Sequence, residues 1–347
     1  MALSDKDLQL KFRTAALFRK QGYVVFHEVE LNAYSYQQKY SRKQITDFDV
    51  LGVRVDVDYQ DAVAVAECKS TEEGAMENLL KLSGVSHFFG AHKSYFVQKR
   101  IDDNAREVGK ELGIWCLDEH NIASMLSSAG IGPQMIENEA KLYEVKAKAR
   151  DAYKAEFAAQ AGYLRTDYWM LPAHRNVINL LHLIQQLAGK VAVGNAHHAL
   201  LVHQLAIGLC YAIMRICGLI VRHNIDQVTE GLLTSILGGS RERRDREVLF
   251  DEIAKLVPDA RLTVKPPFFE SLAELVNRFV QAMDSSHLVL ACMDAMCSRL
   301  ALGVNVPDGA YNDRTIKLAR DIFRFTATYT GIDKAIFEPF LTGKAKE

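Results

Sequence analysis

The chain has 347 residues, which is long for a single hydrophobic core and predicts two domains. Apolar residues make up 49% and charged residues 24%, a balance that indicates a soluble globular protein and excludes disordered and fibrous classes. The net charge of −1 excludes a global basic field. A surface that binds nucleic-acid phosphates would therefore have to be a local patch.

The first part of the chain, residues 1–130, alternates helical and extended patterns. Apolar residues at helical spacing predict helices, and runs of β-branched and aromatic residues predict strands. The predicted elements are a helix over 5–21, strands over 23–31, 45–57 and 62–70, a helix over 72–91, a strand over 94–99, a helix over 102–114 and a strand over 114–117. The sequence thus predicts an α/β domain with a mixed sheet and the core order α-β-β-β-α-β.

Residues 131–347 have helical periodicity, with breaks near 188–195, 237–246, 256–268 and 303–309. They predict an all-helical domain that selects a substrate or a partner protein. Residues 199–221 are nearly long enough to span a membrane, but His203, Gln204 and Arg215 interrupt them. We therefore expect a buried core helix and no membrane association.

The six cysteines are scattered, without a C-x-x-C pair, and the N-terminus has no basic-then-apolar leader. This pattern favours reduced thiols in the cytoplasm.

The hairpin formed by the second and third predicted strands places acids at its entrance and an acid and a lysine at its exit. Side chains alternate between the faces of a strand, so Asp47 shares a face with Asp49, and Glu67 shares a face with Lys69. If residues 57 and 61 flank the turn, Asp49 lies opposite Lys69 and diagonal to Glu67. This arrangement requires a loop with an odd number of residues or a bulge.

Two carboxylates beside an ammonium are suited to metal-assisted phosphodiester hydrolysis. Hard carboxylate oxygens suit Mg²⁺, with Mn²⁺ as an alternative. A neighbouring lysine can orient a metal-bound water and offset charge on the reacting phosphate.

The segments "FDV" and "AECKS", in the order of elements predicted for residues 5–127, resemble the PD-(D/E)XK nuclease superfamily, which includes restriction endonucleases. The resemblance implies a restriction-endonuclease-like fold, metal ligation by Asp49 and Glu67, and a catalytic role for Lys69. A third acidic ligand would come from Glu28, Glu30 or Asp47. The resemblance also implies DNA as the substrate, and a role in restriction or defence against foreign DNA.

Two basic segments are candidates for contacts with phosphate. Residues 32–44 interleave aromatic and basic side chains that could bind DNA, or form an exposed polar extension of a hairpin. The side chains concerned are Tyr34, Tyr36, Lys39, Tyr40, Arg42 and Lys43. Residues 240–247 contain interleaved acids, which favour a salt-bridged helix start over phosphate binding.

A second function class is open: a nuclease-fold subunit that no longer cleaves and acts in DNA binding or as a scaffold in a larger complex. The histidines His197, His198 and His203 lack the spacing of a metal site, so we expect packing or capping roles. The sequence has no phosphate-binding glycine loop of the nucleotide-dependent enzymes. The sequence is compatible with a homo-oligomer.

Overall fold

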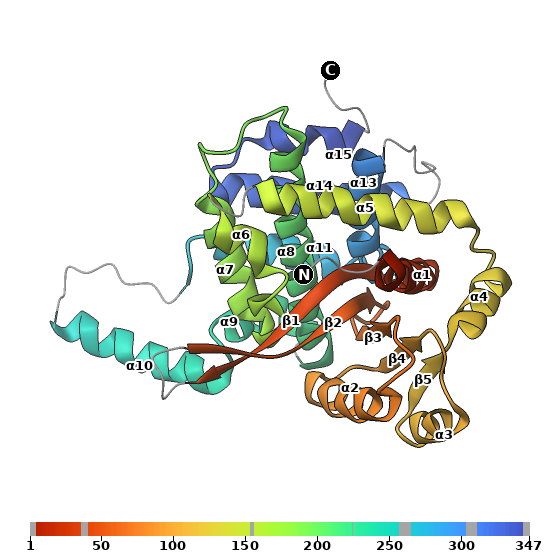
Figure 1. Ribbon diagram of the computed structural model, residues 1–347. Coiled ribbons are helices and arrows are strands. Elements are labelled where there is room, and N and C mark those ends of the chain that lie inside the picture. Colours follow the sequence, from red (N-terminus) through yellow and green to blue (C-terminus); the bar gives the residue numbers. More distant parts are fainter. Residues whose placement is uncertain are drawn as a thin grey trace. The chain divides into compact units, whose positions relative to one another are not determined.

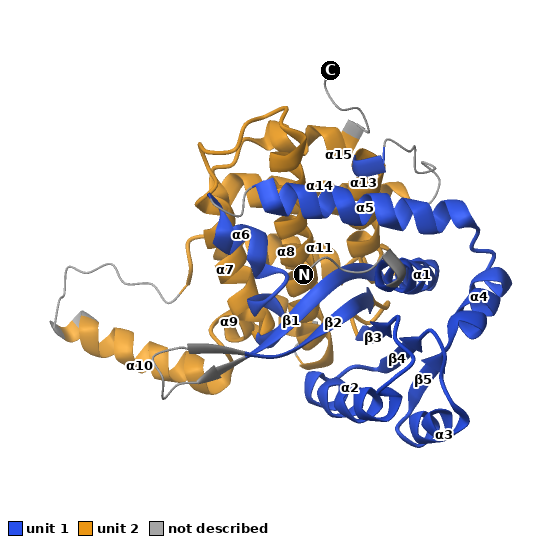
Figure 2. Cartoon of the chain, viewed as in Figure 1, with its two compact units in different colours: residues 1–54, 61–170, 301–304 blue, residues 55–60, 171–300, 305–347 orange. Residues whose placement is uncertain are grey.

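The computed structural model describes residues 5–35, 41–152, 156–223, 225–256, 265–302 and 311–342. The chain divides into two compact units (Figure 2). Unit 1 comprises residues 1–54, 61–170 and 301–304, and unit 2 comprises residues 55–60, 171–300 and 305–347. The main division falls after Met170, so it differs from the boundary predicted at residue 130.

Unit 1 contains a five-stranded mixed sheet with the strand order β1-β2-β3-β4-β5. β1 and β2 are antiparallel, whereas β3, β4 and β5 run parallel to one another. The predicted order α-β-β-β-α-β is confirmed, and the structure adds α4, which was not predicted. The bounds are α1 (Asp5–Lys20), β1 (Val24–Ser35), β2 (Ser41–Val55), β3 (Asp61–Lys69), α2 (Ala75–Phe89), β4 (Lys93–Gln98), α3 (Asp103–Glu111), β5 (Ile114–Leu117) and α4 (Glu119–Ser128).

Helices cover both faces of this sheet (Figure 1). Apolar residues of α1 and α4 pack against β-strand residues that include Val50, Ala66 and Cys68 in one buried cluster. On the other face, α2 buries Leu79 and Leu82. Ala66 and Cys68 face α1. Because side chains alternate along a strand, Glu67 and Lys69 face α2.

The turn between β2 and β3 differs from the predicted one. The amide of Asp56 donates to the carbonyl of Gln60 at 3.1 Å, and the amide of Tyr59 donates to the carbonyl of Asp56 at 3.0 Å. Asp56 and Gln60 therefore flank a three-residue loop in which Tyr59 has a left-handed backbone with φ 60°. The predicted pairing of residues 57 and 61 is wrong, but the loop has the odd length that the hypothesis required.

Three further elements complete unit 1: α5 (Pro133–Ala152), α6 (Ala158–Tyr163) and the short 3-10 helix η2 (Asp167–Met170). α5 packs on α1, where the ring of Tyr143 lies 5.5 Å from that of Phe12. Arg19 of α1 donates to Glu139 of α5 at 2.5 Å. α5 has the helical periodicity expected after residue 130, but it belongs to the same compact unit as the sheet.

Among the described residues of unit 2 after Leu171, the regular elements are helices, as predicted. Its central helix α8 is long and apolar enough to cross a membrane, but 78% of its most apolar window is buried, which confirms a core helix. The predicted breaks at 256–268 and 303–309 fall largely outside the described residues. The bounds are α7 (Ala173–Gln185), α8 (Ala196–His223), η3 (Ile225–Gln227), α9 (Val228–Ile236), α10 (Ser240–Leu256), α11 (Phe269–Val280), α12 (Met283–Ser286), α13 (Val289–Leu302), α14 (Asp313–Thr330), η4 (Lys334–Phe337) and α15 (Glu338–Thr342).

Candidate active site

Glu67 and Lys69 form an ion pair at the end of β3. The Lys69 Nζ lies 2.5 Å from Glu67 Oε1, and the exposed fractions of the two side chains are 38% and 13%. Cys68 between them faces α1, so the pair faces α2. The sequence predicted this shared face, and the structure confirms it.

Asp47 and Glu67 line one small recess beneath α2. Asp47 lies in β2, where its Cα partner across the sheet is Glu30 of β1. The recess is completed by Thr46, Phe48, Asn78, Lys81, Leu82 and Val85. A carboxylate from each of two neighbouring strands therefore borders the same space.

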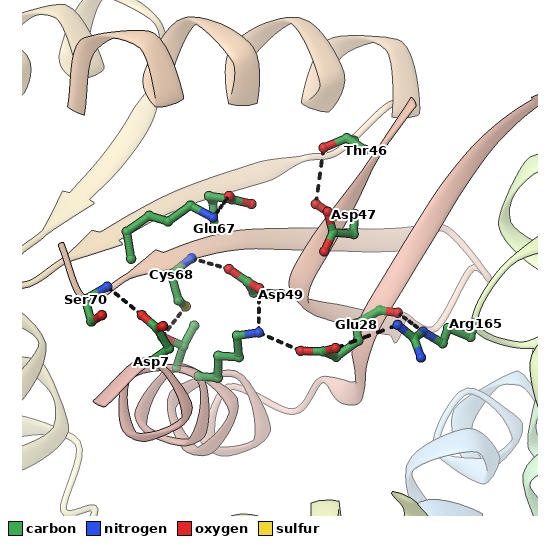
Figure 3. A network of polar contacts seen from close by, with 12 residues as sticks. Asp7, Glu28, Thr46, Asp47, Asp49, Glu67, Cys68, Ser70 and Arg165 are labelled. Atoms are coloured by element: carbon green, nitrogen blue, oxygen red, sulfur yellow. Dashed lines mark hydrogen bonds and ion pairs between the residues drawn. The ribbon is translucent and has the colours of Figure 1, made fainter. Parts of the chain in front are cut away.

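Asp49 is turned toward other partners (Figure 3). Its Oδ1 lies 2.7 Å from the Nζ of Lys11 on α1, and its Oδ2 accepts a 2.7 Å hydrogen bond from the amide of Cys68. The carboxylate thus contacts Lys11 on the α1 side of the sheet. The regular pairing had predicted a place opposite Lys69, whereas in the structure Asp49 acts on Glu67 and Lys69 through its charge.

A local irregularity between β1 and β2 accounts for this difference. His27 pairs with Val50 and Val29 pairs with Phe48, while Glu28 and Asp49 between them are not paired in the ladder. Glu28 has a left-handed backbone with φ 56°, which is uncommon for a residue with a side chain. On the neighbouring strand, Asp49 contacts Lys11 of α1 and Val50 belongs to the buried cluster that includes α1, so the two side chains depart from strict alternation.

Glu28 is held by two cations. The Nζ of Lys11 lies 2.6 Å from Glu28 Oε1, and Arg165 Nη2 lies 3.7 Å from Glu28 Oε2. Arg165 also contacts Glu30 Oε1 at 2.9 Å and donates to the backbone carbonyl of Glu28 at 2.9 Å. Glu28 and Glu30 are therefore engaged in a structural network with Lys11 and Arg165, which the sequence interpretation had missed.

The charges of these acids act on one another even where they do not touch. Burial raises the pKa of the Glu67 carboxyl, the charge of Asp49 raises it further, Lys69 opposes the rise, and Asp47 adds to it. Burial lowers the pKa of the Lys69 ammonium, but Glu67, Asp49 and Asp47 outweigh burial, so that pKa is raised. Three carboxylates thus favour the charged form of Lys69.

Asp49 and Lys11, which form an ion pair, show the same balance between burial and neighbouring charge. Burial raises the pKa of the Asp49 carboxyl, and Lys11 and the Cys68 amide oppose this rise only in part. Burial lowers the pKa of Lys11, but Asp49 and Glu28 outweigh it and raise that pKa overall. Lys11 is consequently a firmly charged ammonium with an exposed fraction of 4%.

The donor set suits a small divalent site. Among the described residues no three His, Cys, Asp or Glu side chains are grouped as metal ligands. Mg²⁺ is commonly held by one or two carboxylates with water and substrate phosphate, so a full protein cage is not needed. Asp47 and Glu67, which border one recess, provide two such carboxylates, whereas Glu28 and Asp49 each already contact Lys11.

The other predicted residues differ in how far the structure describes them. Tyr36, Lys39 and Tyr40 lie outside the described residues, as do the side chains of Tyr34, Arg42 and Lys43. The amides of His197 and His198 donate to Asn195, and the ring of His203 stacks on that of Phe340 with centroids 3.9 Å apart. The packing expected of His203 is confirmed. At the start of α8 the cap is Asn195, and the ring of His198 accepts a hydrogen bond from the amide of Ala192. In the second basic cluster, Arg243 pairs with Glu230 and Glu247, as a salt-bridged helix start predicts.

Comparison of the chain with protein-family models, with curated proteins and with solved structures finds no match.

Proposed function

We propose that this chain is a divalent-metal-dependent endonuclease that hydrolyses phosphodiester bonds in DNA. The observation that carries the proposal is the surroundings of Lys69. Its ammonium contacts Glu67, and the charges of Asp49 and Asp47 also act on it, at the end of a buried strand. Metal-assisted phosphodiester hydrolysis uses hard oxygen donors to hold the ion, and a neighbouring positive charge can offset charge on the reacting phosphate.

In this proposal Glu67 and Asp49 hold one Mg²⁺ or Mn²⁺, and Asp47 assists from the recess. The bound ion supplies polarisation of the phosphate and a water of lowered pKa. Lys69 orients the attacking water and offsets negative charge that develops on the phosphate oxygens. Its partial exposure of 38% leaves it accessible to a substrate.

The resemblance to PD-(D/E)XK nucleases supports DNA over RNA as the substrate. Residues 32–44 would supply stacking and phosphate contacts through Tyr36, Lys39, Tyr40, Arg42 and Lys43. We further propose a cytoplasmic role in restriction or defence against foreign DNA, with unit 2 selecting the substrate or a partner protein.

A second candidate is a DNA-binding or scaffold subunit that does not cleave. The observation that favours it is the contact between Asp49 and Lys11, because a carboxylate already bound to an ammonium is less available to a metal. The two candidates differ in catalysis and agree in DNA binding.

The test is a cleavage assay with purified protein on plasmid, linear and single-stranded DNA and on RNA, with Mg²⁺ or with a chelator. The nuclease proposal expects nicking or linearisation that requires the metal and that is lost in Glu67→Gln. DNA binding without metal-dependent cleavage, under every substrate and metal condition, would support the scaffold instead. Cleavage that persists equally in Glu67→Gln would point to a contaminant or another site.

A further inference from the structure

The ammonium of Lys11 lies between two carboxylates that come from different strands. Its Nζ is 2.6 Å from Glu28 Oε1 on β1 and 2.7 Å from Asp49 Oδ1 on β2. The exposed fractions are 4% for Lys11, 16% for Glu28 and 9% for Asp49, so this is a largely buried ionic cluster. The nearly equal distances place the positive charge centrally between the acids.

Two other features fix the carboxylates around this point. The left-handed backbone of Glu28, in a position skipped by the β1–β2 ladder, directs its side chain out of the regular strand pattern. Arg165 then binds the Glu28 carboxylate and its backbone carbonyl, and the Cys68 amide binds the second oxygen of Asp49. Each acid therefore keeps one oxygen directed at Lys11 while the other is held elsewhere.

We propose that Lys11 is a positioning residue whose ammonium fills a cation position between Glu28 and Asp49, so that no divalent ion binds there. The inference rests on the proposed function only in its view of Asp49 as a metal ligand. In that setting the site takes a single divalent ion, on the Glu67 side of Asp49. Lys11 holds Asp49 in place for that ion.

Chemistry supports the replacement of one cation by another. Without the ammonium, two buried carboxylates would face each other at close range, and like charges in such a position destabilise the fold. Small divalent ions bind carboxylate oxygens at about 2.0–2.6 Å, slightly closer than the ammonium does. A neutral side chain at position 11 should therefore leave a gap that a divalent ion can close.

The experiment compares Lys11→Gln with the wild type in the absence of nucleic acid. Bound Mn²⁺ is counted by electron paramagnetic resonance, and melting temperature is measured with and without the ion. Lys11→Gln is expected to be less stable than wild type without metal and to bind one Mn²⁺ more per chain. Its melting temperature should rise about 5 °C more than that of wild type when Mn²⁺ is about a hundredfold above its Kd.

Two variants serve as matched controls. Lys11→Arg keeps the positive charge and should bind no additional ion. Lys11→Gln/Glu28→Gln removes the facing acid as well, so it should regain stability without metal and should lose the additional ion. If Lys11→Gln is unfolded without metal, Mn²⁺ should restore its fold.

The inference is overturned if Lys11→Gln gains neither an ion nor a larger metal-dependent shift, or if Mn²⁺ fails to fold an unfolded variant. It is also overturned if Lys11→Arg gains the same ion. These readouts contain no nucleic acid, so a protein that gains the ion but never cleaves DNA would contradict the proposed function and leave this inference standing.

Discussion

Lys69 stands in a field of three carboxylates but touches only one of them. Its ion pair with Glu67 is partly exposed, so the pair itself contributes little to the stability of the fold. The pKa of Glu67 is raised by burial and, in addition, by the neighbouring charges of Asp49 and Asp47. A perturbed acid and an accessible lysine at the end of a buried strand are typical of a reactive site.

The first prediction concerns Lys69. If its ammonium acts mainly in the transition state, Lys69→Ala should lower the cleavage rate at least about a hundredfold and leave DNA affinity nearly unchanged. Single-turnover cleavage and a binding assay under identical salt conditions measure the two effects. Lys99→Ala is the matched control, because Lys99 is an exposed lysine after the neighbouring strand and pairs with Glu72. Equal rates for both variants would rule out the catalytic role of Lys69.

The second prediction separates Asp49 from Asp47. Asp49 is buried. Among the neighbouring charges that raise the pKa of Glu67, that of Asp49 has the larger effect and that of Asp47, in the recess, has the smaller one. Asp49→Asn should abolish cleavage and the Mg²⁺-induced rise in melting temperature, and Asp47→Asn should weaken both only in part. The melting temperature of each variant without metal controls for the loss of the Lys11 contact. An inactive Asp47 variant beside an active Asp49 variant would assign the metal to the recess.

For individual residues, the sequence predicts which side chains share a face of a regular strand. It does not predict the contacts of residues that depart from this regular pattern. Alternation correctly put Glu67 and Lys69 on one face, but it could not show that Asp49 contacts Lys11. Lys11 did have a signal, because it lies three residues after Leu8 and four before Ala15 on the apolar face of its helix. Arg165 had none, since it contacts Glu28 from 137 residues away.

At the scale of elements, hydrophobic periodicity predicted the helices and strands of unit 1 because each buries one regular face. The irregular positions were not predictable in the same way. The turn after β2 places Tyr59, and not a glycine, in the left-handed region, so the usual residue that marks such a loop is missing. Tyr59 is held instead by tertiary contacts within unit 2, where its hydroxyl donates to the carbonyl of Phe279 at 2.6 Å.

The third prediction tests how this turn packs on α8. A Cβ added at Gly218 would lie 2.7 Å from the carbonyl oxygen of Tyr59, a backbone atom that cannot move away cheaply. Gly218→Ala should therefore lower the free energy of unfolding by about 1–3 kcal/mol, as overpacking does. Gly84→Ala is the control, because nothing lies within 4 Å of its added Cβ in α2. That change should be neutral or stabilise by up to about 1 kcal/mol, since alanine favours helix.

If denaturant unfolding gives the same sign for both variants, the close approach of the turn to Gly218 is not maintained in solution. The comparison is sharp because both glycines are helical and neither has a positive φ, so intrinsic helix preference acts equally on the two changes.

At the scale of the whole molecule, the sequence predicted a mixed-sheet part followed by a helical part, and this coarse order is present. The change of pattern near residue 130 marks where strands end, but it does not mark where packing ends. α5 is charged along most of its length, and its buried residues, Glu139, Leu142 and Ala149, are too few to stand out as an apolar face. Membership of a compact unit depends on distant contacts that a local pattern does not contain.

The last prediction compares two fragments, residues 1–130 and residues 1–170. Both lack residues 171–347 and carry the same turn at residues 55–60, so their difference reports residues 131–170 alone. The shorter fragment loses Leu142, the Tyr143 ring against Phe12, the ion pair of Arg19 with Glu139, and the Arg165 contacts with Glu28. Burying one large apolar side chain is worth about 1.5–3 kcal/mol, so fragment 1–130 should be at least about 3 kcal/mol less stable.

Circular dichroism during urea unfolding measures this difference between the fragments. Fragment 1–170 should unfold in a single cooperative transition at a higher urea concentration, and fragment 1–130 should unfold at a lower one or lack a cooperative transition. Coincident transitions would mean that the sheet with α1 to α4 is stable by itself. The boundary predicted from the sequence would then describe the folding unit better than the compact unit does.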